Sequence, residues 1–201
     1  MHEIEPYHQW RDYYIASEDR KSPFYKRTYS EFEWSNTVYN YYIHPQWDHF
    51  GSETLYLKIL YADYIRNFTV IELLGEWNDC ITNDIMLLKR KVIDKLLRRE
   101  IFKFLLIGEN VLNFHADDDC YYEEWHEEVR EQDGWIVAMN FREHVLTEMQ
   151  TCDLQRYLNW GTKFDKINWR SCRPLHLYQT IEQVIHGSDW KQLLHNPDEQ
   201  R

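Results

Sequence analysis

The feature that most constrains this chain is an alternation of short apolar runs with segments of helical periodicity between residues 54 and 149. Apolar runs stand at residues 68–74, 104–107 and 135–139. Runs of this length are typical of buried strands, whereas apolar residues at every third and fourth position are typical of amphipathic helices. Strands that alternate with helices pair in parallel through right-handed crossovers. The pattern therefore predicts an α/β domain.

A helical segment follows each of the three apolar runs. In the first, Asn83 is the expected N-cap, and Asp84 favours the positive end of the helix dipole. The three segments are defined by their apolar positions: Ile85, Leu88, Val92, Ile93 and Leu96; Tyr122, Trp125 and Val129; and Phe141, Val145 and Met149. The element order after residue 68 is then strand, helix, strand, helix, strand, helix.

An additional strand is expected before the alternating part. Residues 55–61 and 68–74 predict two antiparallel strands joined by residues 62–67, with Gly75 closing the second strand. A helix across residues 53–65 is the alternative, because periodicity alone does not settle a short apolar run. With the hairpin, the sheet is mixed. The next strand, residues 104–107, is expected to end at Gly108.

The chain divides into three expected parts: a 1–53 N-terminal extension, the 54–150 α/β domain, and a 151–201 helical C-terminal extension. Residues 23–48 are rich in aromatic and β-branched side chains, and a turn at Ser35, Asn36 and Thr37 predicts a β-hairpin there. Gly161 and Pro174 are expected to break the C-terminal helices, and residues from Asn196 onward are expected to be disordered.

The net charge limits the possible partners, and the cysteine pattern indicates the cellular compartment. The net charge of −11 repels nucleic-acid phosphates and anionic membrane surfaces, so no nucleic acid and no membrane are expected, and a protein partner with a basic surface is favoured. A homodimer remains open. The cysteines form no C-x-x-C pair, and no signal peptide or long apolar span is visible, which indicates the cytoplasm.

Particular stretches of the α/β part carry a family resemblance. Residues 70–76 (Val-Ile-Glu-Leu-Leu-Gly-Glu) resemble the second strand of the STAS domain of anti-sigma-factor antagonists and anion-transporter tails, including its glycine–acid ending. Residues 104–107 continue through 111–114 into Asp117, Asp118, Asp119 and Cys120, where that family has an aspartate, a phosphorylatable serine and a glycine. The resemblance covers about residues 54–149 and implies a STAS-like fold and a regulatory, protein-binding function.

The chain departs from the family at the phosphoacceptor. The serine is absent, and Asp117 or Asp118 stands nearest its place. A carboxylate at a helix N-terminus accepts N–H bonds there, as a phosphoserine would, with less charge. It could therefore mimic a permanently phosphorylated state. The alternative is that one of Asp117, Asp118 and Asp119 is only the N-cap of the helix that carries Trp125.

Polar residues follow the expected strands. Ligands of open α/β sheets bind at the carboxyl edge of the strands. Residues expected near that edge also include Asp79, Asn113, Asn140, Arg142 and His144, and the candidate binding residues are Glu76, Asn78, Glu109, Asn110, His115, Asp117, Asp118 and Asp119. Carboxylates with a histidine could hold a hard cation or act as acid and base. The alternative is that the asparagine and aspartate side chains satisfy loop backbone groups and that Glu76 faces water.

Two further clusters have ordinary explanations. His44, Asp48 and His49 could supply metal ligands, but a closed zinc site needs a fourth partner, and a loop with a buried Trp47 is favoured. The basic run at residues 89–91 (Lys-Arg-Lys) is expected to be a solvated helix face.

Common nucleotide-binding and hydrolase motifs are absent. We therefore expect no catalytic residue, cofactor or metal, and a non-enzymatic regulatory or protein-binding module with an acidic edge. A metal-dependent enzyme or small-ligand-binding protein that uses the carboxylate, asparagine and histidine cluster is the alternative function.

Overall fold

The computed structural model describes residues 4–30, 37–38 and 41–187. The chain forms two compact units, Met1–Trp160 and Gly161–Arg201. The predicted disorder from Asn196 onward, and the Ser35 and Asn36 part of the expected turn, lie outside the described residues. Among the described residues, no helix combines the length and apolarity that crossing a membrane would require.

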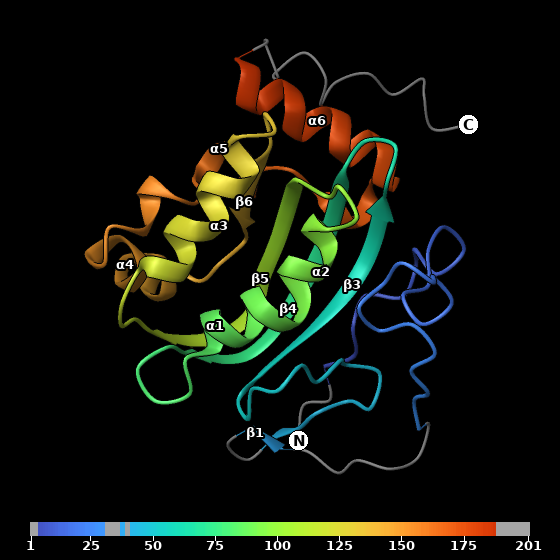
Figure 1. Ribbon diagram of the computed structural model, residues 1–201, viewed down its shortest axis with the longest axis horizontal. Helices are drawn as coiled ribbons and strands as arrows, with labels where there is room; N and C mark the ends of the chain where they lie inside the picture. The colour runs from blue at the N-terminus through green and yellow to red at the C-terminus, as the bar shows by residue number, and fades with distance from the viewer. Residues whose placement is uncertain (1–3, 31–36, 39–40, 188–201) are drawn as a thin grey trace. The chain divides into compact units, whose positions relative to one another are not determined.

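The first unit is built on a four-stranded sheet (Figure 1). Its strands, in the order in which they lie side by side, are β3 (Leu55–Asp63), β4 (Phe68–Asn78), β5 (Lys103–His115) and β6 (Trp135–Met139). β3 and β4 are antiparallel, whereas β4–β5 and β5–β6 are parallel. The expected mixed sheet of STAS-like order is thereby confirmed, and the alternative helix over residues 53–65 is wrong.

Two strands are longer than their apolar runs. Gly75 does not close β4, because the strand continues to Asn78 beside β5. Gly108 likewise does not end β5, which runs on to His115. In both cases pairing between the neighbouring strands supplies the backbone hydrogen bonds, so polar side chains are tolerated beyond the apolar run. Gly75 has φ +119°, and a Cβ there would lie 2.0 Å from the carbonyl oxygen of Thr54 on the chain entering β3.

The helices follow the expected strand–helix order. α1 (Asp84–Leu88), the π-helical turn η1 (Lys89–Ile93) and α2 (Asp94–Leu97) form one continuous helical segment between β4 and β5. Asn83 is its N-cap, as predicted, and its side chain accepts a hydrogen bond from Met86 N. α3 (Cys120–Arg130) links β5 to β6, and α4 (Glu143–Thr151) follows β6, starting two residues after Phe141.

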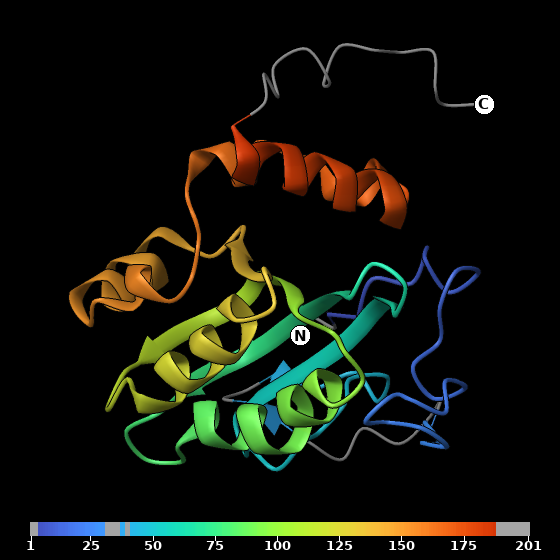
Figure 2. The ribbon, with the colours of Figure 1, turned by 45° about the horizontal axis from the view of Figure 1, so that its top comes forward.

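The main core lies between the sheet and these helices. Figures 1 and 2 show α1, α2 and α3 on one face of the sheet. On that face Trp125 packs edge-on against Phe104 with ring centroids 5.1 Å apart, and Trp77 lies between Phe114 and Tyr122. Tyr122, Trp125 and Val129 are buried, as their helical spacing predicted. Burial of several aromatic side chains makes this interface the main source of hydrophobic stabilisation.

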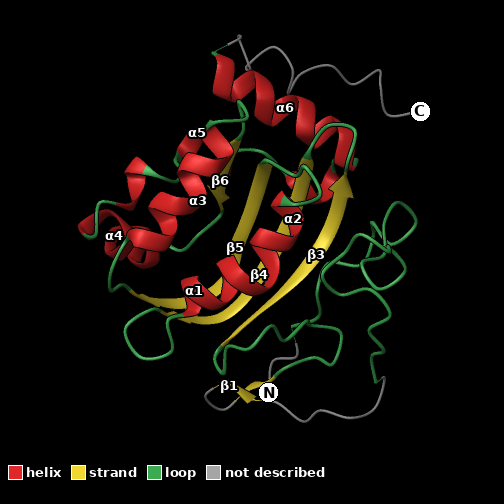
Figure 3. Ribbon diagram, in the orientation of Figure 1, coloured by secondary structure: helices red, strands yellow, loops and turns green. Residues whose placement is uncertain are grey.

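The N-terminal segment is mostly loop, as Figure 3 shows. β1 (Thr37–Val38) and β2 (Tyr41–Tyr42) pair antiparallel, so two paired strands are present within residues 23–48. The predicted turn is misplaced, because Thr37 belongs to the first strand, and each strand has only two residues. Val38, Ile43 and Trp47 form a second, smaller core with Tyr56 and Leu74 of the sheet.

Short segments cover both edges of the sheet. Asp48 exchanges backbone hydrogen bonds with Leu57 on the outer side of β3. Asn159 does the same for β6, donating to Ile136 O and accepting from Ala138 N. Pairing of this kind occupies the backbone groups of an edge strand and so protects it from association with another chain. A partner is therefore not expected to add a strand at these positions.

The remaining helical pieces are short until the last one. η2 (Leu154–Arg156) closes the first unit. The second unit contains α5 (Thr162–Asp165), the 3-10 turn η3 (Trp169–Ser171) and α6 (Pro174–His186). Gly161 is the N-cap of α5, and Pro174 is the first residue of α6, where its fixed φ suits a helix start. The helical C-terminal part and its two predicted breaks are thus present.

Candidate functional site

The carboxyl ends of β4 and β5 meet at a junction that is organised by the buried carboxylate of Asp79. Asp79 Oδ2 accepts a hydrogen bond from the Tyr122 hydroxyl at 2.6 Å, and Oδ1 accepts from Trp77 Nε1 at 3.0 Å and from Ile85 N at 2.8 Å. The backbone N–H of Asp79 donates to His115 O at 2.8 Å. One side chain therefore connects the β4–α1 loop to α1 and α3, and its backbone connects the loop to β5.

Burial makes this carboxylate unusually basic. The Asp79 side chain is almost completely buried. Desolvation raises its pKa to about 6, against hydrogen bonds from Tyr122, Ile85 and Trp77 that lower it. The negative charge of nearby Asp84 raises the pKa of Asp79 further. For the same reasons, burial first and Asp79 second, the pKa of Tyr122 is raised well above its ordinary value.

Asp84 fixes the same loop from the helix side. Its Oδ2 accepts from Asn78 N at 2.8 Å, and its Oδ1 accepts from the Thr82 hydroxyl at 2.8 Å. Thr82 also donates to Asn78 O at 2.7 Å, so the donor is shared between the strand end and the helix start. Asp79 and Asp84 are both buried. Because a satisfied buried network rigidifies its surroundings, the loop between them has little freedom to move.

The eight predicted binding residues fall into three groups. In the first, Glu76 lies 3.1 Å from His115 Nε2 and 3.4 Å from the side-chain nitrogen of Asn78. These residues lie within β4 and β5 rather than in loops, and Asn78 faces His115 across the two strands. His115 is half exposed, whereas Glu76 is only 14% exposed, so the expectation that Glu76 simply faces water is wrong.

The second group contains Glu109 and Asn110, which lie in the middle of β5 where β6 has already ended. Glu109 accepts a hydrogen bond from Asn140 Nδ2 at 2.9 Å, and its backbone carbonyl accepts from Arg142 Nε at 3.4 Å. Asn110 pairs in register with Leu74 of β4 and is half-buried. This group links β5 to the start of α4.

The third group is the β5–α3 loop with its three aspartates. Asp119 is the N-cap of α3 by position, but its carboxylate accepts from the Tyr157 hydroxyl at 2.8 Å instead of capping the helix. Asp118 accepts from Cys120 N at 2.8 Å. Asp117 and Asp118 are exposed. The N-cap expected among the three aspartates is therefore Asp119 by position, while Asp118 binds the first N–H of α3 and Asp117 is exposed to solvent.

Sequence reasoning missed one residue of this edge. Ile81 is 84% exposed in the β4–α1 loop. The thiol of its neighbour Cys80 donates to Ala116 O, which ties this loop to the start of the aspartate loop. The available signal was an isolated apolar residue among polar ones, outside any helical or strand period.

The predicted solvated face at residues 89–91 is wrong for its first residue. Lys89 is fully buried, and its ammonium group contacts Asp94, Glu124 at 3.0 Å and Glu128 at 2.8 Å. Arg90 adds a two-pronged contact to Glu124 at 2.6 and 2.8 Å. Oxygen atoms of Asp94, Glu124 and Glu128 lie close enough together to hold a metal ion, but the Lys89 ammonium already occupies that position.

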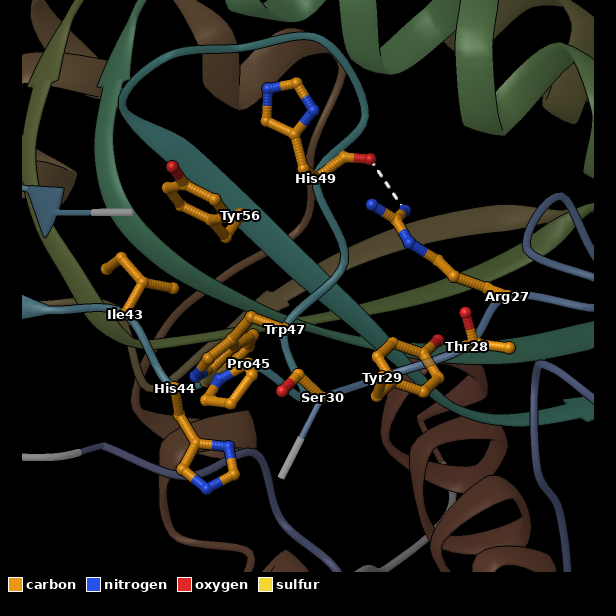
Figure 4. A pocket seen from close by; sticks show the side chains of 10 residues that line it. All are labelled: Arg27, Thr28, Tyr29, Ser30, Ile43, His44, Pro45, Trp47, His49 and Tyr56. Atoms are coloured by element: carbon orange, nitrogen blue, oxygen red, sulfur yellow. Dashed lines mark hydrogen bonds between the residues drawn. The ribbon is translucent and has the colours of Figure 1, made fainter. Parts of the chain in front are cut away.

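A polar pocket of about 170 Å³ lies beside the second core (Figure 4). Figure 4 shows the rings of His44 and His49 directed away from each other. Asp48 is fully buried and accepts from the Tyr29 hydroxyl at 2.6 Å, and Lys58 Nζ lies 3.2 Å from its other oxygen. Burial raises the pKa of Asp48 against these contacts. The two histidines and Asp48 therefore do not converge on one ion, and the expected loop with a buried Trp47 is confirmed.

Comparison with known proteins adds one finding. Neither a protein-family model nor a curated protein sequence matches the chain. Among solved structures, the chain is similar to a "putative anti-sigma factor antagonist" from Thermotoga maritima, with 16% sequence identity and a TM-score of 0.41. The similarity covers 64% of this chain and 92% of the other. The chain itself has the mixed α/β architecture that the sequence predicted.

Proposed function

We propose that this protein is a non-enzymatic, cytoplasmic regulatory module that binds a protein partner through the edge formed by the β4–α1 and β5–α3 loops. We call the residues Ile81, Asp117 and Asp118 the binding edge. The observation that carries the proposal is the 84% exposure of Ile81 on a loop that buried carboxylates hold in place.

The physical argument concerns anchors and their surroundings. Protein interfaces are stabilised mainly by a few large side chains that become fully desolvated, surrounded by polar residues that exclude water. Ile81 offers such an apolar anchor, and the exposed carboxylates of Asp117 and Asp118 offer an acidic surround. Because Asp79 and Asp84 restrict the β4–α1 loop before binding, less conformational entropy is lost when a partner docks.

Charge supports a basic partner. The chain carries a net charge of −11. An acidic surface increases the rate at which a basic partner associates, with a strong dependence on salt. On the helical segment that follows the β4–α1 loop, Lys89 and Arg90 are paired with Glu124, so their positive charges are offset. We therefore expect the partner to present lysine or arginine residues around an apolar groove.

The test compares two isoleucines of similar exposure. Ile81→Asp changes the binding edge, whereas Ile65→Asp changes the β3–β4 turn at the other end of β4, where Ile65 is 89% exposed. Immobilised wild-type protein and each variant are incubated with a lysate of the source cells, and retained proteins are quantified by mass spectrometry. We expect a partner that wild type and Ile65→Asp retain equally and that Ile81→Asp loses.

A second variant addresses the acidic surround. Asp117→Asn combined with Asp118→Asn should reduce retention of the same partner and weaken its dependence on salt. Both variants should keep the wild-type urea midpoint, because the altered side chains are exposed. Equal retention by wild type, Ile81→Asp and the double variant would remove this edge as the binding site.

A further inference from the structure

A second cavity, of about 280 Å³, lies on the face of the sheet opposite the main core. Leu73 and Val111 belong to that core. Their neighbours Leu74 and Leu112 therefore point to the opposite face, as alternate residues of a strand must. The cavity is lined by Leu74 and Gly75 of β4, Leu112 of β5, Arg142 before α4, and Ile4, Val38, Tyr41 and Ile43 of the N-terminal segment.

Among the described residues, the lining is apolar apart from the hydroxyl of Tyr41 and the charge of Arg142. Val38, Ile43 and Leu74 are buried and belong to the second core. No acidic side chain is among the described residues that line the cavity. An apolar group that enters such a space leaves water without leaving a buried polar group unpaired, and this favours binding.

Arg142 supplies the charge and retains free donors. It is exposed, and the one hydrogen bond that its side chain makes to the described residues runs from Nε to Glu109 O at 3.4 Å. Its two terminal nitrogens therefore have no protein partner among the described residues. A guanidinium group with both terminal nitrogens available matches the two oxygens of a carboxylate.

We propose that this cavity binds a small monocarboxylate, with its apolar body between β4, β5 and the N-terminal segment and its carboxylate on Arg142. The size of the ligand follows from the volume of the cavity. Benzene, with six carbon atoms, fills a protein cavity of about 150 Å³. The cavity here measures about 280 Å³. In the same proportion it accommodates roughly eleven non-hydrogen atoms.

A medium-chain aliphatic acid or a substituted aromatic acid has this size. The site is distinct from the binding edge and does not depend on it. Octanoate is a suitable probe, and octan-1-ol is its matched neutral control. Both are titrated into the full-length protein by isothermal calorimetry at concentrations below aggregation of the ligand.

We expect one octanoate per chain with saturable binding. Binding of octan-1-ol should be at least tenfold weaker, because a charge-assisted bidentate contact is lost. Saturable binding of octanoate should persist in Ile81→Asp, which alters only the binding edge.

Two variants test separately the contact of the carboxylate with Arg142 and the binding of the apolar body in the cavity. Arg142→Gln should bring octanoate down to the affinity of octan-1-ol, whereas Arg130→Gln, at an exposed position on α3, should bind octanoate like wild type. Leu112→Trp should fill the cavity and abolish binding of both ligands while far-ultraviolet circular dichroism stays unchanged. The proposal is overturned if octanoate does not saturate at low-millimolar concentration, if both ligands bind alike, or if Arg142→Gln keeps the preference for octanoate.

Discussion

Replacing Asp79 with asparagine should change how the stability of the protein depends on pH. Asparagine is nearly isosteric, and its oxygen can still accept from Trp77 Nε1 and Ile85 N as Asp79 Oδ1 does. Its amide nitrogen would face the Tyr122 hydroxyl, whose oxygen can accept a hydrogen bond. The variant therefore removes the titrating group while keeping most of the contacts.

The sign and size follow from the raised pKa. The pKa of Asp79 is about 6 in the folded protein and 3.8 for the free group, so the folded state holds the proton more tightly. The contribution of the Asp79 carboxyl group to the free energy of unfolding is fully present below pH 3.8 and is lost as the pH rises through about 6. At about 1.4 kcal/mol per unit of pKa, the whole shift corresponds to about 3 kcal/mol. Between pH 4.5 and 7 the loss is about 2 kcal/mol.

The assay is urea unfolding of wild type and Asp79→Asn at pH 4.5 and at pH 7. The difference in the free energy of unfolding between the two proteins cancels the titration of all other groups. As the pH rises from 4.5 to 7, we expect the stability of the variant relative to wild type to increase by about 2 kcal/mol. Asp133→Asn, at an exposed turn between α3 and β6, is the control and should show no such movement. Parallel pH profiles for wild type and Asp79→Asn would refute the assignment.

Two more predictions concern packing. In Lys89→Met, the three carboxylates around Lys89 lose their cation but are partly exposed. The free energy of unfolding should therefore fall by roughly 2 kcal/mol, less than the usual cost of breaking a buried pair. Millimolar calcium should then raise the melting temperature of this variant, but not of wild type or of the exposed control Lys91→Met. The absence of a calcium effect on Lys89→Met would contradict the geometry of the three carboxylates. At Gly75, positive φ combines with the 2.0 Å approach of an added Cβ to Thr54 O. Gly75→Ala should consequently cost about 3 kcal/mol or more in urea unfolding. Gly51 has a similar φ of +120°, but an added Cβ would meet nothing nearer than 3.7 Å. Gly51→Ala should cost only about 1 to about 2 kcal/mol, and equal losses in the two variants would show that the close approach does not matter.

Local periodicity in the sequence was sufficient to predict the order of the helices and strands. The spacing of Tyr122, Trp125 and Val129 predicted which face of α3 is buried, and the cap at Asn83 predicted where the first helix begins. These features depend on neighbours within one or two turns of the same segment, so they are written into the sequence. The mixed order of the sheet followed from the same alternation.

Strand lengths and the grouping of polar residues were decided only by tertiary structure. Residues 109–115 form a strand because β4 lies beside them, which no apolar period indicates. Lys89 is buried because Asp94, Glu124 and Glu128 from two separate segments surround it. The raised pKa of Asp79 and the exposure of Ile81 have the same origin. Desolvation and long-range charge contacts depend on which segments meet in space, whereas a sequence records only which residues are adjacent along the chain.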